Sequence, residues 1–223
     1  MVRIEIAGRL TRWLLAGVIL AASAQVLAQN APANAAPVQF RGVYASIDMR
    51  PTEEMIRRLG ASYGSDRRMA IREVLRAPSS YMPPVLYALA NTLAEDDSEN
   101  AILWYHVGRL RAVYDALRCR DKTAQVALLE LRKRLGAELR TNQYYRRDRL
   151  VRLAQKAIDW DASNPRDYDQ RWVTLYGKAA AASAGADAGE LFVPESEWPA
   201  ILKRVHDAHL QSVQKFAAEK RGQ

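Results

Sequence analysis

Three histidines are the residues of this chain whose type and spacing could support chemistry. His206 and His209 are three positions apart, so in a helix they lie about 60° apart on one face. His106 is expected on the apolar face of another helix. Three imidazoles directed at one core could hold zinc in a metal-dependent enzyme. Because the sequence lacks an H-E-x-x-H motif, we interpret the histidines as contacts between helices and expect no metal or other cofactor.

The other catalytic patterns considered do not support an enzyme. Residues 60–64 (GASYG) match the G-x-S-x-G spacing of a serine hydrolase, but they lie between two expected helices and do not follow a strand, so we expect no serine-hydrolase site here. Gly185 and Gly189 are not followed by the Lys-Ser or Lys-Thr pair of a phosphate-binding loop. Cys119 is the single cysteine, which excludes an internal disulfide. Arg118 and Arg120 could activate its thiol, but the C-terminal end of a helix acts in the opposite direction. We therefore predict a half-buried thiol, no catalytic residue and no enzymatic activity.

A basic and aromatic segment beginning at Gln143 is the most distinctive surface candidate. Tyrosine and arginine are enriched in binding hot spots, because they offer large contact areas and several hydrogen-bond donors. The predicted binding residues are Tyr144, Tyr145, Arg146, Arg147, Arg149 and Arg152. The alternative is an exposed helix start, with its tyrosines packed inward and its arginines in water.

The stretch 98–121 must position much of the rest of the chain. Ser98 is a good N-cap and no proline follows it, which predicts one long helix. One face of this helix is apolar and consists of Leu103, Val107, Leu110, Tyr114 and Leu117. The opposite stripe is made mostly of small residues that let another backbone approach: Ala101, Tyr105, Gly108, Ala112 and Ala116. Arg111, Asp115 and Arg118 share a narrow edge beside Trp104, with Arg109 across from them. A helix with two packing faces is expected in the middle of a bundle.

Hydrophobic periodicity in the remaining chain predicts more helices and no convincing run of strands. Helices are expected at 51–59, 66–76, 84–94, 122–135, 143–160, from Asn164-Pro165 through Tyr176, and at 197–216. A weakly alternating stretch at 38–49 could be extended. The predicted fold class is all-α, a helical bundle of about seven helices.

Residues 86–112 resemble a helix pair of the tetratricopeptide or Sel1-like class. The likeness is carried by Ala90 in the first helix and by Ala101, Trp104 and Tyr105 in the second. No second copy follows at a period of about 34 to 36 residues, which argues against a solenoid. The resemblance implies an antiparallel helix pair. The segment 104–121 also resembles uncharacterised exported proteobacterial proteins, some of which accompany secreted toxins.

The N-terminus is typical of a secretion signal. Three arginines precede an apolar run of about ten residues, which is too short to span a bilayer, and small residues follow it. We expect cleavage after Ala28, with Ala24 as the alternative site and a retained anchor as the other possibility. The predicted domains are a signal peptide (1–28), a spacer (29–50), a helical core (51–178), a linker (179–196) and a C-terminal helix packed on the core (197–223).

The net charge bears on the class of partner. Removal of the leader, with its three Arg and one Glu, leaves a net charge of +6. A basic exported protein favours an acidic protein surface or anionic envelope components, and export disfavours nucleic acid. We predict a periplasmic, non-enzymatic protein-binding protein without a membrane span in its mature form, most specifically an inhibitor or immunity protein for a secreted toxin or envelope hydrolase. The alternatives are a Sel1-like envelope scaffold or assembly factor, and a metal-dependent envelope enzyme that uses the three histidines.

Overall fold

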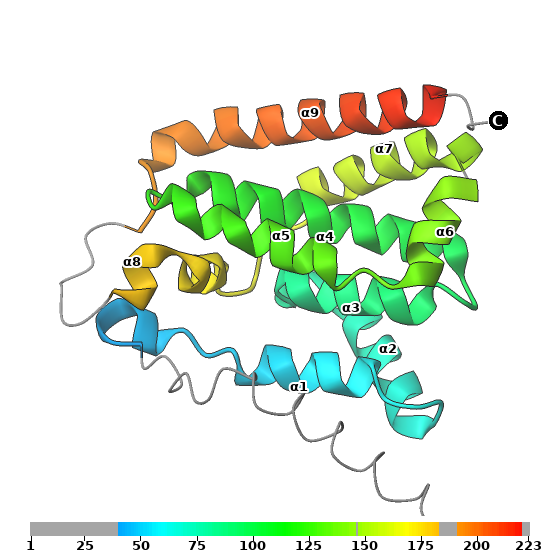
Figure 1. Cartoon of the computed structure of the whole chain (residues 1–223), viewed down its shortest axis with the longest axis horizontal. Helices are drawn as coiled ribbons and strands as arrows, with labels where there is room; N and C mark the ends of the chain where they lie inside the picture. The colour runs from blue at the N-terminus through cyan, green and yellow to red at the C-terminus, as the bar shows by residue number, and fades with distance from the viewer. Residues whose placement is uncertain (1–39, 146, 183–190, 220–223) are drawn as a thin grey trace, which may run out of the picture. The chain divides into compact units, whose positions relative to one another are not determined.

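Helix α4 (Ser98–Arg118) runs through the middle of the fold, and other helices pack on several of its sides (Figure 1). The structure is a computed structural model that describes residues 40–145, 147–182 and 191–219. All of these belong to one unit, Gln39–Gln223. The predicted signal peptide, and the predicted spacer as far as residue 39, lie outside the described residues.

The regular secondary structure of the described part of the chain is helical. The other α-helices are α1 (Arg50–Leu59), α2 (Ser65–Arg76), α3 (Pro83–Leu93), α5 (Val126–Lys133), α6 (Ala137–Tyr145), α7 (Arg147–Ser163), α8 (Lys178–Ala181) and α9 (Trp198–Ala218). Short 3-10 helices connect them: η1 (Gly42–Ser46), η2 (Pro78–Ser80), η3 (Lys122–Gln125), η4 (Gln170–Tyr176) and η5 (Glu195–Glu197). A single isolated bridge, between Cys119 and Phe192, is the β-type pairing seen in these residues. The prediction of an all-α bundle is confirmed.

The helices follow one another in layers on either side of α4. Helices α7 and α9 pack on α4 and on each other, while α3 lies against α4 from another side (Figure 1). Helix α1 packs on α3, and α2 packs on α1. Within the described residues, no helix is both long enough and apolar enough to cross a bilayer.

Both predicted packing faces of α4 are buried in this arrangement. On the apolar face, Val107 and Leu110 are at most 1% exposed. On the small-residue face, Gly108 lies so close to α3 that a Cβ added to it would be 3.0 Å from the ring of Tyr87 and 3.1 Å from the Cβ of Leu86. The absence of a side chain at this glycine therefore sets how closely α3 and α4 approach.

The narrow charged edge of α4 is also buried, and its charges are paired inside the protein. Arg111 and Asp161 of α7 are both inaccessible, and their side chains lie 3.1 Å apart (Nε to Oδ1). Arg166 donates to the other oxygen of Asp161 at 2.5 Å, and Nε2 of His206 from α9 lies 2.9 Å from the same oxygen. Arg111 also donates to the carbonyl of Pro165 at 2.8 Å. One carboxylate therefore joins α4, α7, α9 and the segment that follows α7.

A second pair, Asp115 with Arg118, continues the buried network along α4. The two side chains are 2.9 Å apart, and Asp115 also accepts from the indole of Trp172 at 2.9 Å and from the hydroxyl of Tyr168 at 3.0 Å. Burial raises the pKa of Asp115 to about 6, although Arg118 and these two donors act in the opposite direction. The guanidinium of Arg118 lies 4.4 Å from the ring centre of Trp198, at the start of α9.

Several predicted helix boundaries are wrong. The N-cap of α4 is Asp97, whose side chain accepts from the amide of Asn100 at 3.2 Å, rather than Ser98. The helix predicted from Asn164-Pro165 is instead an irregular segment followed by η4, because the carbonyls of both residues accept from Arg111. Residues 42–46 form η1 rather than an extended stretch.

The region between α4 and α7 also differs from the prediction. The helix expected at 122–135 is divided into η3 and α5, and a separate helix, α6, follows Gly136. The amide of Gly136 donates to Asn91 of α3 at 2.9 Å, which anchors the chain at this break. The basic helix expected to begin at Gln143 begins at Arg147. Part of the predicted linker, residues 183–190, lies outside the described residues, and its first residues belong to α8.

We predict that Gly108→Ala destabilises the protein. The methyl group would gain roughly 1 kcal/mol of helix propensity, but overpacking against Leu86 and Tyr87 costs about 1 to 3 kcal/mol, and the Cβ of Leu86 cannot move without its backbone. Urea denaturation should give a lower free energy of unfolding. Gly60→Ala is the control, since its added methyl would be 3.4 Å or more from any neighbour. Equal stability of Gly108→Ala and the wild type would contradict the close packing.

We also predict that Asp161→Ala lowers the free energy of unfolding by about 3 to 5 kcal/mol, because Arg111 would remain buried without its carboxylate. The control is Asp207→Ala, which removes an exposed partner of Lys203 and should change stability little. The measurement is again urea denaturation at pH 7. A similar small effect for the two variants would show that Asp161 does not neutralise Arg111.

Candidate functional site

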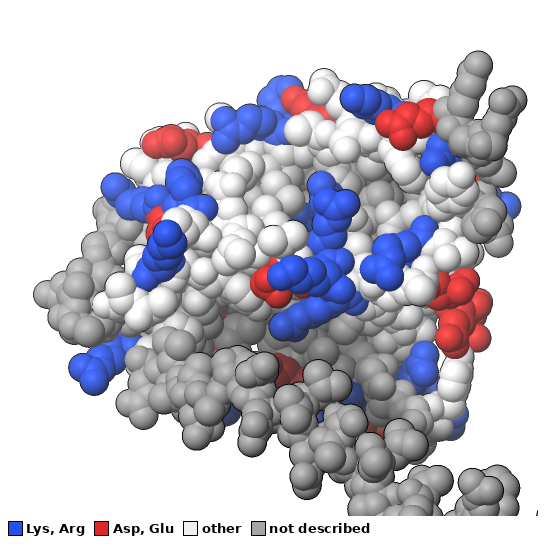
Figure 2. Space-filling view, in the orientation of Figure 1, with Lys and Arg blue, Asp and Glu red and all other residues white. Residues whose placement is uncertain are grey.

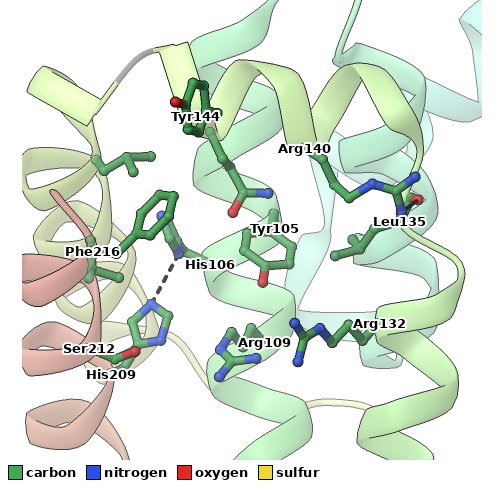
Figure 3. A pocket seen from close by; sticks show the side chains of 13 residues that line it. Tyr105, His106, Arg109, Arg132, Leu135, Arg140, Tyr144, His209, Ser212 and Phe216 are labelled. Carbon is green, nitrogen blue, oxygen red and sulfur yellow. Dashed lines mark hydrogen bonds between the residues drawn. The ribbon is translucent and has the colours of Figure 1, made fainter. Parts of the chain in front are cut away.

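The principal candidate site is a pocket of about 480 Å³ at one end of the fold, between α4, α5, α6, α7 and α9. On α6 and on α9, the lining positions are three or four residues apart, so each of these helices contributes one of its faces to the wall. Figure 3 shows this pocket from close by. The lining residues are Tyr105, His106, Arg109, Arg132, Leu135, Arg140, Gln143, Tyr144, Leu150, His209, Ser212, Val213 and Phe216.

The pocket is cationic. Arg109 comes from α4, Arg132 from α5 and Arg140 from α6, and none of the described lining residues is Asp or Glu. In the described structure, no carboxylate forms an ion pair with any of these three guanidinium groups. Arg140 donates to the carbonyl of Leu135 at 2.6 Å, and in Figure 3 its guanidinium lies toward Leu135, apart from those of Arg109 and Arg132. Cations that line one pocket without a neutralising acid create a positive potential that favours an anionic ligand.

The surface around the pocket has the same sign. Lys and Arg side chains gather over the middle of the face shown in Figure 2, the face on which α5 lies in Figure 1. The one acidic side chain of α5, Glu130, is paired with Lys133 at 2.7 Å. A second cavity of about 260 Å³ shares Arg109, His209 and Ser212 with the pocket, so the hollow continues along α4 and α9.

Aromatic and apolar side chains line the other end of the pocket. Tyr144 of α6 and Phe216 of α9 lie at the end opposite Arg109 and Arg132 in Figure 3. Both rings are held by Arg147, whose guanidinium lies 4.6 Å from the ring centre of Tyr144 and 4.4 Å from that of Phe216. Arg147 itself donates to the carbonyl of Glu219 at 2.6 Å.

Two of the three histidines meet in the wall of the pocket. Nε2 of His209 lies 3.1 Å from Nδ1 of His106, as the dashed line in Figure 3 shows. His106 is 3% exposed, and its other ring nitrogen, Nε2, is buried without a hydrogen-bond partner. This nitrogen is an N–H donor if His209 donates to His106, and an acceptor if His106 donates to His209. In either tautomer, it can form a further hydrogen bond.

Both imidazoles are neutral at pH 7. Burial, the charge of Arg109 and the neighbouring His209 lower the pKa of His106 well below its usual value. Burial is also the largest cause that lowers the pKa of His209 to about 4, with Arg109 and His206 contributing. At neutral pH, the positive charge of the pocket is therefore that of its arginines.

The third histidine points elsewhere. His206 contacts Asp161 at 2.9 Å, and that carboxylate is already bonded to Arg111 and Arg166. Throughout the described ranges, no group of three or more His, Cys, Asp or Glu is placed to hold a metal ion. The structure thus brings together His106 and His209 of the three candidate metal ligands, but not His206.

Cys119 is fully buried rather than half-buried. Its Sγ lies 3.4 Å from the carbonyl of Asp115, and burial raises the pKa of the thiol to about 12. Since the thiolate is the reactive form, this thiol is inert in the folded state.

The predicted binding residues do not form one surface. Tyr144 lines the pocket, and Arg147 is buried between the rings of Tyr144 and Phe216. Arg149 and Arg152 both bind Glu99 in the first turn of α4, the latter at 3.0 Å. Arg146 and the side chain of Tyr145 lie outside the described residues.

Sequence reasoning missed most of the pocket. Arg109 was placed across from the charged edge of the central helix, a position that does face the pocket, but nothing in the sequence paired it with Arg132 or Arg140. Arg140 belongs to α6, a helix that was not predicted. On α9, Ser212 and Phe216 follow His209 at i+3 and i+7, and this spacing was the available signal that they share its face.

No protein-family model, curated protein or solved structure matches this chain. The chemistry of the site therefore rests on its geometry. The two imidazoles that line the pocket are bonded to each other, not to an acid or a nucleophile, and the lining carboxylate that acid–base catalysis would use is missing from the described wall. Three guanidinium groups are suited to binding an anion.

We predict that the stability of the protein falls as the pH is lowered from about 6.5 to 4. The folded-state pKa of His209 lies below that of an unfolded histidine, so its stabilising contribution is present above about pH 6.5 and is lost as the pH falls through about 4. His106 acts in the same direction. Asp115, with its raised pKa, acts in the opposite direction between about pH 4 and 6.

Comparison with His209→Gln isolates the histidine contribution, since Asp115 is common to both proteins. The free energy of unfolding of the wild type should fall more steeply, by roughly 1 kcal/mol per pH unit within this window. Urea denaturation at a series of pH values measures both curves. Parallel curves would mean that His209 is not buried in its neutral form.

Proposed function

We propose that this chain is a non-enzymatic binding protein that holds an anionic group of a protein partner in the pocket between α4, α5, α6, α7 and α9. The observation that carries the proposal is that Arg109, Arg132 and Arg140, from three helices, line one pocket whose described lining contains no carboxylate. Arginine binds carboxylate and phosphate oxygens through two parallel hydrogen bonds, so three such side chains favour an anion over a neutral group.

The contrast with the arginines of the core supports the same proposal. Arg111 and Arg118 are buried, and each is paired with an aspartate. The pocket arginines are left without such partners among the described residues, although acidic side chains are frequent on the surface. Uncompensated like charges close together cost stability, and a bound anion would offset that cost.

The shape of the site limits the kind of contact. A concave pocket accepts a group that projects from the partner, such as an acidic side chain or a chain terminus. A pocket of this shape does not itself project, so it cannot enter a recessed catalytic cleft of the partner. The leader suggests export. For an exported inhibitor of a toxin or envelope hydrolase, we propose that this pocket binds a projecting acidic group of that partner.

The test is affinity capture from an envelope extract of the organism that encodes the chain. The wild type should retain a stoichiometric partner, and the double variant Arg109→Gln/Arg132→Gln should lose it, since each charged hydrogen bond contributes about 1.5 to 3 kcal/mol. The matched control is Arg68→Gln/Arg72→Gln on α2, which removes the same charge from exposed positions outside the pocket.

Circular dichroism and urea denaturation would establish that both double variants are folded. A partner retained equally by the wild type and by both double variants would show that the pocket is not the contact. The absence of any stoichiometric partner would contradict the protein-binding function.

A further inference from the structure

We infer that the group held in the pocket is an organic acid, a carboxylate or phosphate attached to an aromatic or similarly apolar body, with its acid at the Arg109 and Arg132 end. This inference rests on the proposed function and names the chemistry of the group that is bound. The same chemistry occurs in a free small molecule and in the C-terminal aromatic residue of a protein chain, and the experiment below distinguishes these sources.

The acid end of the pocket is defined by three donors of different helices. In Figure 3, the side chains of Arg109 and Arg132 lie at the same end of the pocket as Ser212. Within the described part of the chain, Arg132 forms neither an ion pair nor a side-chain hydrogen bond. A planar acid group that enters here therefore meets guanidinium donors that no internal carboxylate occupies.

The opposite end is suited to an apolar body. Tyr144 and Phe216 lie at this end in Figure 3, and both line the pocket. Arg147 is not among the lining residues, so its contacts with the two rings hold them from outside the pocket and leave aromatic carbon on the pocket side. Aromatic side chains fixed in this way offer a surface for stacking another ring.

Between the two ends, the unpartnered Nε2 of His106 indicates a missing polar atom. A buried polar group without a hydrogen bond costs free energy, and groups of this kind in native proteins call for an explanation. His106 lines the pocket, and only 3% of its surface is exposed. Because this nitrogen is itself inaccessible, a polar substituent of the ligand near the middle of the pocket would supply the partner only after the imidazole ring has moved.

The volume also favours a body attached to the acid. The pocket measures about 480 Å³, which lies in the range of about 300 to 1,000 Å³ that is usual for sites of drug-sized ligands. An inorganic phosphate would occupy the cationic end and leave the aromatic end unfilled.

Isothermal titration calorimetry with the purified chain at pH 7 tests the inference. The acids with a ring are phenylacetate, phenyl phosphate and the peptide acetyl-Gly-Gly-Phe with a free carboxylate. The matched probes are acetate and inorganic phosphate, which lack the ring, and 2-phenylethanol and the peptide amide, which lack the acid. We expect at least one ring-bearing acid to bind at least tenfold more tightly than its matched probes.

Three variants locate the binding. Arg132→Gln, at an exposed position, should weaken the binding of a ring-bearing acid about tenfold or more, because it removes a charged donor. Phe216→Ala should weaken the ring-bearing acids but not acetate or inorganic phosphate. Arg68→Gln on α2 is the charge-matched control and should leave every affinity unchanged. Thermal melting establishes that each variant is folded.

Binding of the free phenyl acids but not of the peptide acid supports a small-molecule source and removes the protein partner from the proposed function, whereas tighter binding of the peptide acid supports a protein terminus. Equal affinity for inorganic phosphate and phenyl phosphate would overturn the inference in favour of a simple anion site. Equal affinity for 2-phenylethanol, or binding that neither Arg132→Gln nor Phe216→Ala weakens, would also overturn it. If no probe binds while Arg109→Gln/Arg132→Gln still abolishes capture of a partner, the proposed function holds and the ligand chemistry inferred here is wrong.

Discussion

The burial of charge in α4 governs how the other helices are placed. Arg111, Asp115 and Arg118 lie on one edge of a helix that is packed on several sides, and each is at most 1% exposed. A charge removed from water must find an opposite charge or several hydrogen bonds. The partners come from α7, from the segment that follows it, from η4 and from α9, so satisfying three side chains of one helix determines where four other parts of the chain must lie.

This constraint also explains the composition of the pocket. The paired edge of α4 is held against Asp161 and Trp172, while Arg109 and His106 lie on other sides of the helix and face the pocket. Arginines therefore occur in two kinds of environment in this protein. Those in the core are neutralised and structural, whereas those of the pocket retain an unmatched charge that is available to a ligand. The proposed function depends on this difference and not on the total charge of the chain.

The fold was predictable to the extent that it depends on local pattern. The periodicity of 98–121 identified a central helix with two packing faces, and the small side chain of Gly108 indicated the close approach of a neighbour, which is α3. Predictions failed where a distant residue decided the local backbone. Pro165 follows a good N-cap residue, yet no helix begins there, because the carbonyls of Asn164 and Pro165 accept hydrogen bonds from Arg111. Likewise, Asn91 of α3 anchors the break at Gly136 that separates α5 from α6.

The candidate site divides in the same way. Local pattern specifies which side chains share a helical face, because positions three or four residues apart lie above one another, and it therefore places His206 and His209 together as candidates. Tyr144 is a candidate because of the basic and aromatic composition of its segment. The packing of the helices, by contrast, brings His209 to His106, turns His206 to Asp161 and places arginines from three helices in the lining of one pocket. The physical reason is that a helical repeat specifies directions around a single axis. Which side chains of different helices meet depends on how those axes pack, and here the buried charges of α4 determine that packing.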